Sequence, residues 1–373
     1  MNILILSWRG PGHPNAGGAE ISTHEHAKGW VKVGHCVTLF TSYYQGAKRK
    51  EQIDGVTIIR EGRQFFGVQW EALKWYLFKD HPKYDLAIDQ FHGIPFFTPL
   101  YVKERKLAFI HEVTKEVWKM NALPRPFNLI PALVGPFFEP LIFKFFYNSI
   151  PFMTVSESTK KDLVNWGIAE DKITIINNGV NIPDGIKKCP KENKKTLVYL
   201  GAISKDKGIE DALRIFSFIN KTNDWQFWVI GKSDSIYMNY LQRLANDLGL
   251  NNKVKFWGFV SELKKFELLS KAHLLMNPSI REGWGLVVIE AAVVGTPTVA
   301  FNVSGLRDSI INDKTGILSD ERSIEGLANK ILELFKDERK LKEMSKNAIL
   351  WSRNFSWEKA TNMSLKLITK IAG

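Results

Sequence analysis

Two hydrophobic periods alternate along the chain. Short apolar runs, typical of buried parallel strands, alternate with longer segments in which apolar positions return every three to four residues, as on one face of a helix. In the first half, strands are expected at residues 2–7, 35–41, 56–60, 86–89, 107–110 and 152–155. A helix is expected at residues 19–33, with a core-facing side made of Ile21, Ala27, Trp30 and Val31. Strands that alternate with helices indicate a parallel sheet covered on both faces.

The alternation starts again after a polar, basic, proline-containing stretch at residues 179–193, which is typical of a linker. The second half predicts strands at residues 196–200, 226–230, 254–256, 274–277 and 298–301, and helices at 209–222, 237–248, 263–270 and 286–294. The tail, residues 323–372, is expected to be helical. The chain is therefore predicted to be an α/β protein with domains at residues 1–182 and 183–350. Two such domains are expected to bind a ligand between them, at the carboxyl ends of their strands.

Length and composition agree with this reading. A chain of 373 residues can bury two large cores without disulfides or structural metals. The two cysteines, Cys36 and Cys189, exclude a disulfide framework and a four-cysteine zinc site, so a reducing compartment such as the cytoplasm is expected. The first six residues are apolar but lack a basic leader, which favours a strand over a signal peptide. No uncharged run is long enough to predict a membrane-spanning helix.

The charge balance is basic, and several familiar sites are absent. The chain has 51 Lys and Arg against 39 Asp and Glu, which gives a net charge of +12. A basic protein attracts nucleic acids, anionic lipids or phosphorylated small molecules, and the net charge alone does not distinguish these partners. The sequence holds no P-loop, no complete dinucleotide fingerprint and no H-E-x-x-H motif. His24 and His26 stand two residues apart, so they do not share a helix face and favour structural roles. No Asp-x-Asp pair is present to grip a metal-bound diphosphate, and no metal site is predicted.

The segment 277–290 carries the strongest chemical signal. An expected strand ends, a glycine-containing loop follows, and a helix opens near Gly285, where exposed N–H groups can bind phosphate. Glu282 lies in the loop and Glu290 lies eight residues further on, so both carboxylates can line one side of a cleft. Carboxylates accept hydrogen bonds from the vicinal hydroxyls of a sugar or a ribose. The alternative is that Glu282 caps the helix and Glu290 is a satisfied, partly buried acid.

This segment resembles the E-x7-E signature of glycosyltransferase family 4, a family of retaining enzymes with the GT-B fold. Further segments match that family in order and spacing: residues 15–20, 109–112, 154–158, 176–181 and 201–208. The resemblance covers nearly the whole chain. It implies two Rossmann-like, doubly wound parallel-sheet domains that face a central cleft. It also implies that a terminal helix, at about residues 351–373, crosses back to the first domain.

The resemblance assigns expected roles residue by residue. It makes three residues the expected catalytic residues. Lys207 binds the donor diphosphate, Glu282 holds the donor sugar, and His111 lies near the transferred sugar. The further expected donor contacts are Gly17, Gly18, Ala202, Ser279, Gly283, Trp284, Gly285, Leu286, Val287 and Glu290.

Each expected role has a plainer alternative, and the sequence departs from the family twice. Lys207 can be a solvated loop lysine, and His111 a buried residue at a strand end. The Gly17–Gly18 pair can be a simple turn. Ala202 stands where the family usually has arginine, with Lys205 nearby, and Asn177 replaces a usual hinge proline.

The implied function is a retaining, metal-independent glycosyltransferase of the hexosyltransferase type, which uses a nucleotide-diphosphate sugar and no cofactor. One alternative is a non-catalytic relative that binds a sugar nucleotide or glycan, which Ala202 motivates. Another is a sugar-nucleotide epimerase of the same fold. Nucleic-acid binding is not favoured, because no aromatic and basic motif supports it. The donor, the acceptor and the oligomeric state are not set by the sequence.

Two aromatic segments, residues 65–78 and 127–152, bear on the acceptor. The second is interrupted by Pro131, Pro136 and Pro140, and it is either a buried core helix or a patch that dips into a membrane. The basic residues that would accompany such a patch are Lys103, Arg105, Lys106, Lys119 and Arg125. A membrane patch would suit a lipid-linked or cell-envelope glycan precursor as acceptor, and peripheral contact with an anionic membrane at its cytoplasmic face.

Overall fold

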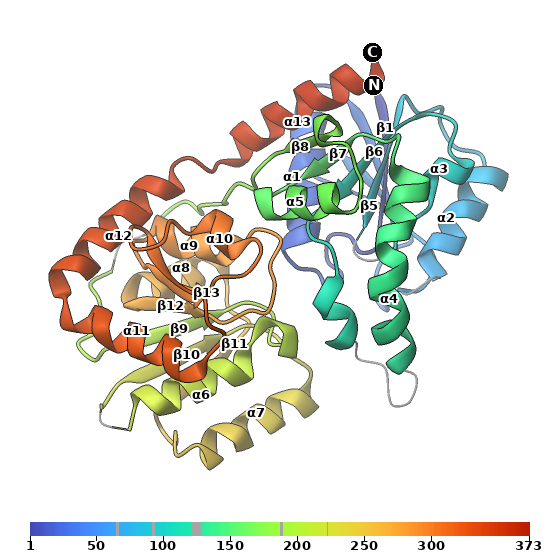
Figure 1. The fold of residues 1–373 in the computed structure, drawn as a ribbon. Helices are drawn as coiled ribbons and strands as arrows, with labels where there is room; N and C mark the ends of the chain where they lie inside the picture. Colours follow the sequence, from blue (N-terminus) through green and yellow to red (C-terminus); the bar gives the residue numbers. More distant parts are fainter. Residues whose placement is uncertain (65–66, 92–93, 121–127, 187–188, 222) are drawn as a thin grey trace. The chain divides into compact units, whose positions relative to one another are not determined.

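The computed structural model describes residues 1–64, 67–91, 94–120, 128–186, 189–221 and 223–373 (Figure 1). Arg125 and Phe127 lie outside the described residues. The chain divides into two compact units. Unit 1 contains Met1–Gly179 and Ser356–Gly373, and unit 2 contains Val180–Phe355. Each unit is built on its own largely parallel sheet, so the predicted pair of doubly wound α/β domains is confirmed.

The sheet of unit 1 has the strand order β3-β4-β2-β1-β5-β6-β7-β8. The strands are β1 Asn2–Ser7, β2 Cys36–Thr41, β3 Lys50–Ile53, β4 Val56–Arg60, β5 Leu86–Phe91, β6 Arg105–Ile110, β7 Phe152–Thr154 and β8 Ile173–Ile175. All described pairs are parallel except β3 with β4. The hydrophobic pattern did not predict β3, because this edge strand reads Lys-Glu-Gln-Ile, and an edge strand needs no continuous apolar run.

The helices of unit 1 follow the expected alternation with strands. They are α1 Gly18–Lys32, α2 Gly67–Phe78, α3 Thr98–Tyr101, α4 Leu129–Ile142, α5 Glu157–Asn165 and α13 Trp357–Ala372. Short turns are η1 Lys115–Met120, η2 Phe143–Tyr147 and η3 Glu170–Lys172. The prolines expected to interrupt α4 do not end it. Pro131 lies in the first turn, where no intrahelical bond is lost, and the helix passes Pro136 and Pro140 before it widens into the π-helical turn η2.

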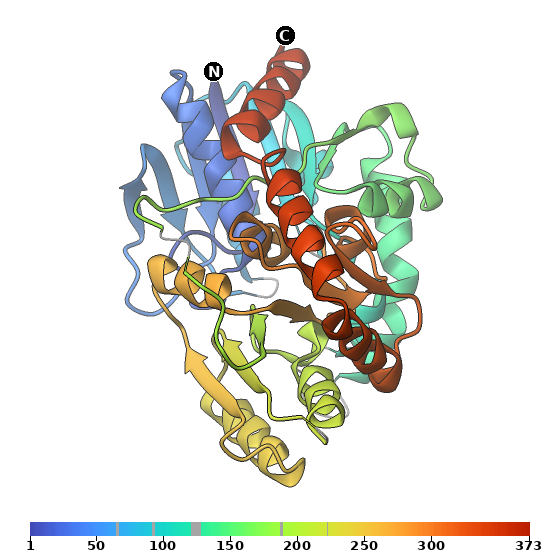
Figure 2. The same cartoon turned by 90° about the vertical axis from the view of Figure 1, so that its left-hand side faces the viewer.

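The terminal helix α13 packs along α1 (Figures 1 and 2). The approach is close, because an ideal Cβ on Gly29 of α1 would lie 2.6 Å from Thr361 Cγ2 of α13. The predicted core-facing side of α1 is partly wrong: Ile21 is 48% exposed, whereas Ser22 and His26 are buried. The buried side of α1 includes these polar side chains because they are hydrogen-bonded. A hydrophobic pattern gives no sign of such hydrogen bonds, so it could not predict this side.

His26 is the centre of this polar contact. Trp30 Nε1 donates to Ser364 Oγ (3.0 Å), and Ser364 Oγ donates to the carbonyl oxygen of Thr361 (3.0 Å). His26 Nδ1, 2.9 Å from Ser364 Oγ, is therefore assigned as the protonated ring nitrogen. Its Nε2 is buried and has no hydrogen-bond partner among the described residues. Burial lowers the pKa of His26 to about 3, since a second ring proton would have no acceptor.

Unit 2 has the strand order β11-β10-β9-β12-β13-β14, and its described pairs are all parallel. The strands are β9 Thr196–Leu200, β10 Gln226–Ile230, β11 Val254–Gly258, β12 Leu274–Asn277, β13 Thr298–Phe301 and β14 Gly316–Ser319. Counted within the unit, this order is 3-2-1-4-5-6, the order of a dinucleotide-binding sheet. The winding reverses between β9 and β12, which is where such sheets bind their ligands.

Helices cover both faces of this sheet. They are α6 Ile209–Ile219, α7 Ser235–Asp247, α8 Glu262–Lys271, α9 Leu286–Val293, α10 Leu306–Ser309, α11 Ile324–Lys336 and α12 Glu338–Ser352, with the turn η4 Lys205–Lys207. In α6, Ile209, Leu213 and Phe216 recur at helical spacing and are fully buried. The strand and helix positions predicted for this half agree with the structure to within a few residues, but β14 and the four-residue helix α10 were not predicted.

The buried His26 predicts a pH dependence of stability. Its pKa is lower in the folded than in the unfolded state, so below pH ~6.5 only the unfolded chain takes up this proton. The free energy of unfolding should therefore fall by about 1.4 kcal/mol per pH unit below that value, until about pH 3. Urea unfolding at several pH values should show this slope reduced by that amount in His26→Gln. Parallel pH profiles for the two proteins would contradict the assignment.

Candidate active site

The loops after β9 and β12 meet where the winding of the unit 2 sheet reverses. The backbone N–H of Ile280, in the loop after β12, donates to the carbonyl oxygen of Asp206, in the turn η4 after β9 (2.9 Å). Gly208 ends that turn with φ +72°, and an ideal Cβ there would lie 2.1 Å from the carbonyl oxygen of Pro278. Only glycine accepts both the left-handed backbone and this close approach. The two loops are therefore fixed against each other by backbone contacts.

A lysine and a glutamate form an ion pair across these loops. Lys207 Nζ lies 3.0 Å from Glu282 Oε2 and donates to the carbonyl oxygen of Arg281 (3.3 Å). Ser279 Oγ lies 2.9 Å from the other carboxylate oxygen, Glu282 Oε1. The Lys207 and Glu282 side chains are 23% and 16% exposed, so a ligand can still reach both groups. The structure thus brings together two of the three predicted catalytic residues and Ser279, a predicted donor contact.

A buried tyrosine, which the sequence reasoning missed, hydrogen-bonds to the backbone of the loop after β9. The hydroxyl of Tyr199, on β9, donates to the carbonyl oxygen of Ala202 (2.8 Å) and lies 3.4 Å from that of Lys207. Burial, and then the negative charges of Glu282 and Asp206, raise the pKa of Tyr199 well above its ordinary range. Tyr199 therefore remains a neutral hydrogen-bond donor that fixes the backbone on which Lys207 stands.

The helix α9 begins beside this ion pair. Gly285 precedes it with φ +82°, and the N–H groups of Leu286 and Val287 lie in the first turn, where they have no acceptor within the helix. The N–H of Glu282 donates to the carbonyl oxygen of Ser304 (3.2 Å), which ties the loop before α9 to the loop after β13. The arrangement places N–H groups and the positive end of a helix next to the Lys207 ammonium, a combination suited to an anion such as a diphosphate.

Glu290, one turn further along α9 from Leu286, forms an ion pair with Lys265. Lys265 Nζ, on α8, lies 2.7 Å from Glu290 Oε1 and also 2.7 Å from Glu262 Oε2. Burial raises the pKa of Glu290, and the charge of Lys265 acts against that rise. Burial also acts to lower the pKa of Lys265, but the charges of Glu290 and Glu262 outweigh it and raise that pKa. Lys265, another residue that sequence reasoning missed, therefore carries a positive charge beside the Glu290 carboxylate.

The other predicted residues of unit 2 differ in their exposure to solvent. Ala202 is exposed, and so is Lys205 beside it. Trp284 is 3% exposed and packs edge-on against Phe355, with ring centroids 5.0 Å apart, so its indole lies in the protein interior. Arg281, which the sequence reasoning passed over, is a buried cation directly before Glu282. Its position next to the motif glutamate is the signal that could have singled it out.

Three predicted residues lie in unit 1, on loops at the carboxyl ends of β1 and β6, two strands that flank β5. Gly17 is the residue that caps the start of α1, and its N–H donates to Glu20 Oε2 (2.6 Å), while Arg9 Nε donates to Glu20 Oε1 (2.9 Å). Glu20 is therefore a helix cap that fixes the Gly17–Gly18 turn. His111 follows β6, is 4% exposed, and packs on Phe109 with ring centroids 4.3 Å apart.

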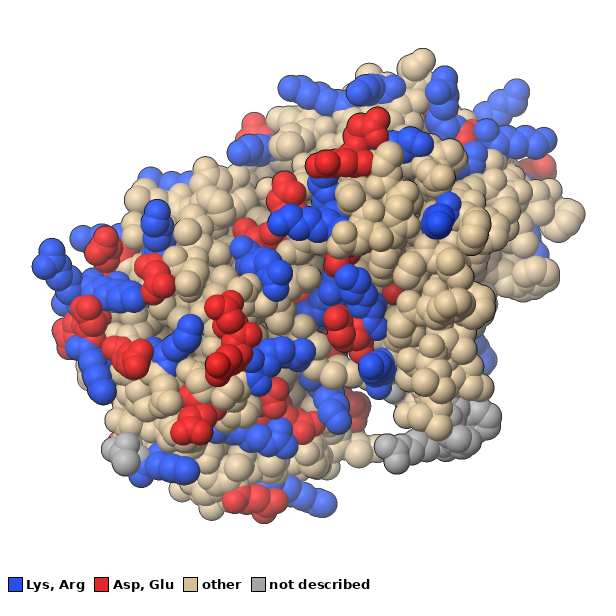
Figure 3. Space-filling model, viewed as in Figure 1, with Lys and Arg blue, Asp and Glu red and all other residues tan. Residues whose placement is uncertain are grey.

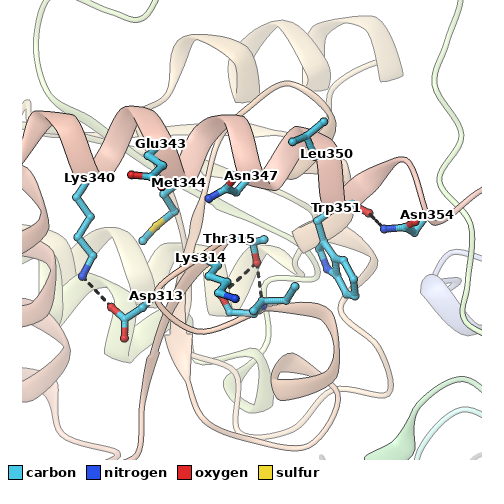
Figure 4. Close-up of a pocket in the computed structure, with 11 residues that line it drawn as sticks. Asp313, Lys314, Thr315, Lys340, Glu343, Met344, Asn347, Leu350, Trp351 and Asn354 are labelled. Atoms are coloured by element: carbon cyan, nitrogen blue, oxygen red, sulfur yellow. Dashed lines mark hydrogen bonds and ion pairs between the residues drawn. The ribbon is translucent and has the colours of Figure 1, made fainter.

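A cavity of about 690 Å³ lies elsewhere in unit 2, beneath α12 (Figure 4). Its lining comes from α12 and from residues before β14, and it includes an ion pair between Lys340 Nζ and Asp313 Oδ1 (2.8 Å). None of the predicted site residues lines it. Among the described residues, moreover, no three His, Cys, Asp or Glu side chains gather as a metal site. The charged groups at the ends of β9 and β12 therefore remain the candidate site.

Comparison with known sequences matches both halves of the chain. The family described as "Glycosyltransferase Family 4" matches residues 16–183, and the family described as "Glycosyl transferases group 1" matches residues 184–351. An uncharacterised glycosyltransferase of Methanocaldococcus jannaschii is 26% identical over 339 residues, which cover 85% of this chain and 84% of that protein. Several other curated relatives, such as the glycogen synthase of Mycobacterium tuberculosis, match over 58% or less of their own length.

Solved structures share the fold at low sequence identity. The sucrose-phosphate synthase of Thermosynechococcus elongatus has a TM-score of 0.81 and 18% identity, over 99% of this chain and 98% of that one. HepE of Anabaena, solved in complex with UDP-glucose, has a TM-score of 0.73 and 18% identity, over 99% of this chain and all of that one. At these identities the likeness shows the fold alone.

The backbone contact at Gly208 predicts that adding one methyl group there, by substitution with alanine, greatly lowers the free energy of unfolding. Gly208→Ala meets both the left-handed backbone and the Pro278 carbonyl, whereas Gly249→Ala, at φ +71°, meets no atom within 4 Å. We expect Gly249→Ala to lower the free energy of unfolding by about 1 kcal/mol and Gly208→Ala by about 3 kcal/mol or more. Urea unfolding of the two variants checks this difference. Equal losses would show that the contact between the loops is not tight.

Proposed function

Because the chain belongs to the group 1 glycosyl transferases and has the GT-B fold, we propose that it moves a hexose from a nucleotide-diphosphate sugar to an acceptor hydroxyl with retention of anomeric configuration. The observation that carries the proposal is the Lys207–Glu282 ion pair, which lies beside the start of α9 where the winding of the unit 2 sheet reverses. A cation, a carboxylate and free helix N–H groups are the groups that a diphosphate and a sugar require.

In this proposal each part of the donor meets one group of the site. The diphosphate binds Lys207 and the N–H groups of Leu286 and Val287. The sugar hydroxyls bind the Glu282 carboxylate, which is oriented by Ser279. The ribose hydroxyls bind Glu290, whose carboxylate lies 2.7 Å from the Lys265 ammonium. His111 and the Gly17–Gly18 turn, on unit 1, serve the transferred sugar and the acceptor.

The chemical step follows from these groups. The bond between the anomeric carbon and the diphosphate oxygen breaks, and its electron pair leaves with the diphosphate. The acceptor oxygen bonds to the anomeric carbon on the same face, and its proton passes to the departing diphosphate oxygen. Lys207 and the N–H groups of α9 stabilise the charge that grows on the diphosphate. Because the protein supplies this positive charge, we propose that neither a metal nor a cofactor is needed.

A second candidate function is a non-catalytic protein that binds sugar nucleotides. Ala202 favours it, because the exposed methyl group supplies no cation where the family usually has arginine. Two other cations lie in the sequence of the same loops: the buried guanidinium of Arg281 and the exposed ammonium of Lys205. They are the candidates to supply the charge that Ala202 lacks. Turnover of a donor distinguishes the two functions, since the non-catalytic protein would bind a donor without releasing its nucleotide.

We also propose a lipid-linked or cell-envelope glycan precursor as the acceptor, with the reaction on the cytoplasmic side of a membrane. The support is the exposed apolar surface of α4, together with the net charge of +12.

A panel of donors tests the proposed reaction. UDP-, GDP-, ADP- and dTDP-sugars, each with membrane lipid extract and EDTA, should yield released nucleotide and a new glycolipid with one donor. Glu282→Gln should lower the turnover number by about 100-fold or more, because a charged contact to the reacting sugar is lost. Binding without turnover for every donor would favour the non-catalytic alternative, and the absence of both would contradict the proposal.

A matched pair of variants distinguishes the proposed contact of Glu290 with the ribose from a general effect of the charges around Lys265. Glu290 and Glu262 lie at the same distance from Lys265. Glu290→Gln should raise the KM for the donor by about 10-fold or more, since a charged hydrogen bond to the ribose is lost. Glu262→Gln should leave that KM unchanged. Equal effects of the two substitutions would show that Lys265, rather than the ribose contact of Glu290, accounts for the loss.

A further inference from the structure

The helical segment Leu129–Tyr147, formed by α4 and η2, turns apolar side chains away from the protein. It is long and apolar enough to cross a membrane, yet only 11% of its most apolar window is buried. The outward face consists of side chains that are each 38–76% exposed: Leu129, Ile130, Leu133, Val134, Phe137, Phe138, Phe145 and Phe146. The core helix of a soluble domain would bury such residues, so the interpretation of this segment as a buried helix is wrong for this face.

One stripe of the segment packs against unit 1 from Gly135 to its end at Tyr147. The stripe comprises Gly135, Glu139, Phe143 and Tyr147, which recur every four residues. An ideal Cβ on Gly135 would lie 2.3 Å from Trp118 Cδ2, and Phe143 is fully buried. At the far end, Tyr147 donates to Asp89 Oδ2 of β5 (2.5 Å). Since this stripe is held by the protein, the segment lies on the surface of unit 1 and offers only its outward face to a partner.

The single acid of the segment belongs to the held stripe. Glu139 is 2% exposed, and its carboxylate accepts hydrogen bonds from the N–H of Thr114 and from Trp118 Nε1 (both 2.8 Å). Burial raises the pKa of Glu139, and these hydrogen bonds act against that rise. With Glu139 turned inward, the exposed charge of the segment is Lys144, and the neighbouring turn η1 exposes Lys119 together with the acid Glu116. Figure 3 shows the surface over α4 as almost free of charged side chains.

We propose that the outward face of α4–η2 docks on the surface of an anionic lipid bilayer and lies in its interfacial layer. A protein partner would be expected to meet polar groups, at about one hydrogen bond per 100–200 Å². Residues 129–143 offer no polar side chain except Glu139, which is turned inward. A bilayer requires no such groups from an apolar face, and the basic side chains at its border attract anionic headgroups. Docking of this kind does not depend on sugar transfer.

Vesicle binding of the full chain, without any donor, tests the proposal. Co-sedimentation should show binding to vesicles of phosphatidylcholine mixed with phosphatidylglycerol, and weaker binding to phosphatidylcholine alone. The variant Leu133→Asp/Phe137→Asp should lower the partition coefficient about 10-fold or more. Lys144→Gln should lower it about fivefold, and only for the anionic vesicles.

The control is Ile236→Asp on α7, a residue of unit 2 that is 82% exposed. It introduces one negative charge, as each single substitution of the double variant does, at an apolar surface position outside the segment, and it should leave the partition coefficient unchanged. Circular dichroism of each variant checks that the fold is kept. Unchanged binding by Leu133→Asp/Phe137→Asp, or no binding of the parent chain to either vesicle, would overturn the proposal. A lipid-free dimer that this double variant dissociates would do so as well, since it would identify a second copy as the occupant.

Discussion

The ion pair between Lys207 and Glu282 is the interaction on which the account of the site depends. It joins two loops that are far apart in the chain but adjacent in the sheet, because β9 and β12 flank the point where the winding reverses. The backbone holds the loops in register, through the Ile280–Asp206 hydrogen bond and the contact of Gly208 with Pro278. A charged pair placed by rigid backbone needs little reorganisation when a charged ligand arrives, which is the condition for electrostatic catalysis.

Unit 2 therefore concentrates opposite charges at one end of its sheet, whereas unit 1 combines buried polar contacts with one large apolar surface. The two motif acids of unit 2 each form an ion pair with a lysine, Glu282 with Lys207 and Glu290 with Lys265. In unit 1 the polar groups hold helices in place: His26 joins α1 to α13, and Glu139 fastens α4. That fastening leaves the apolar side of α4 exposed. One unit is thus suited to a charged nucleotide sugar and the other to a lipid surface.

Much of the fold was predictable because the buried strands of both sheets read as short apolar runs. The failures have physical causes. β3 is a polar edge strand, and the buried side of α1 is polar because His26 and Trp30 bond to Ser364 of a helix more than 300 residues away. The Lys207, Glu282 and Glu290 positions were predicted from spacing and family resemblance. Tyr199 and Lys265 were not, because their roles depend on contacts that only the folded chain creates.

Hydrogen–deuterium exchange on the full chain, with and without UDP, GDP or ADP, tests the central claim most directly. A bound nucleoside diphosphate should slow exchange in residues 201–208 and 282–290, because the N–H groups of Leu286 and Val287 become hydrogen-bonded to phosphate. The residues around the cavity beneath α12 should exchange at unchanged rates. Protection confined to that cavity, or no protection by any of the three nucleotides, would contradict the claim that the donor binds at the Lys207–Glu282 pair.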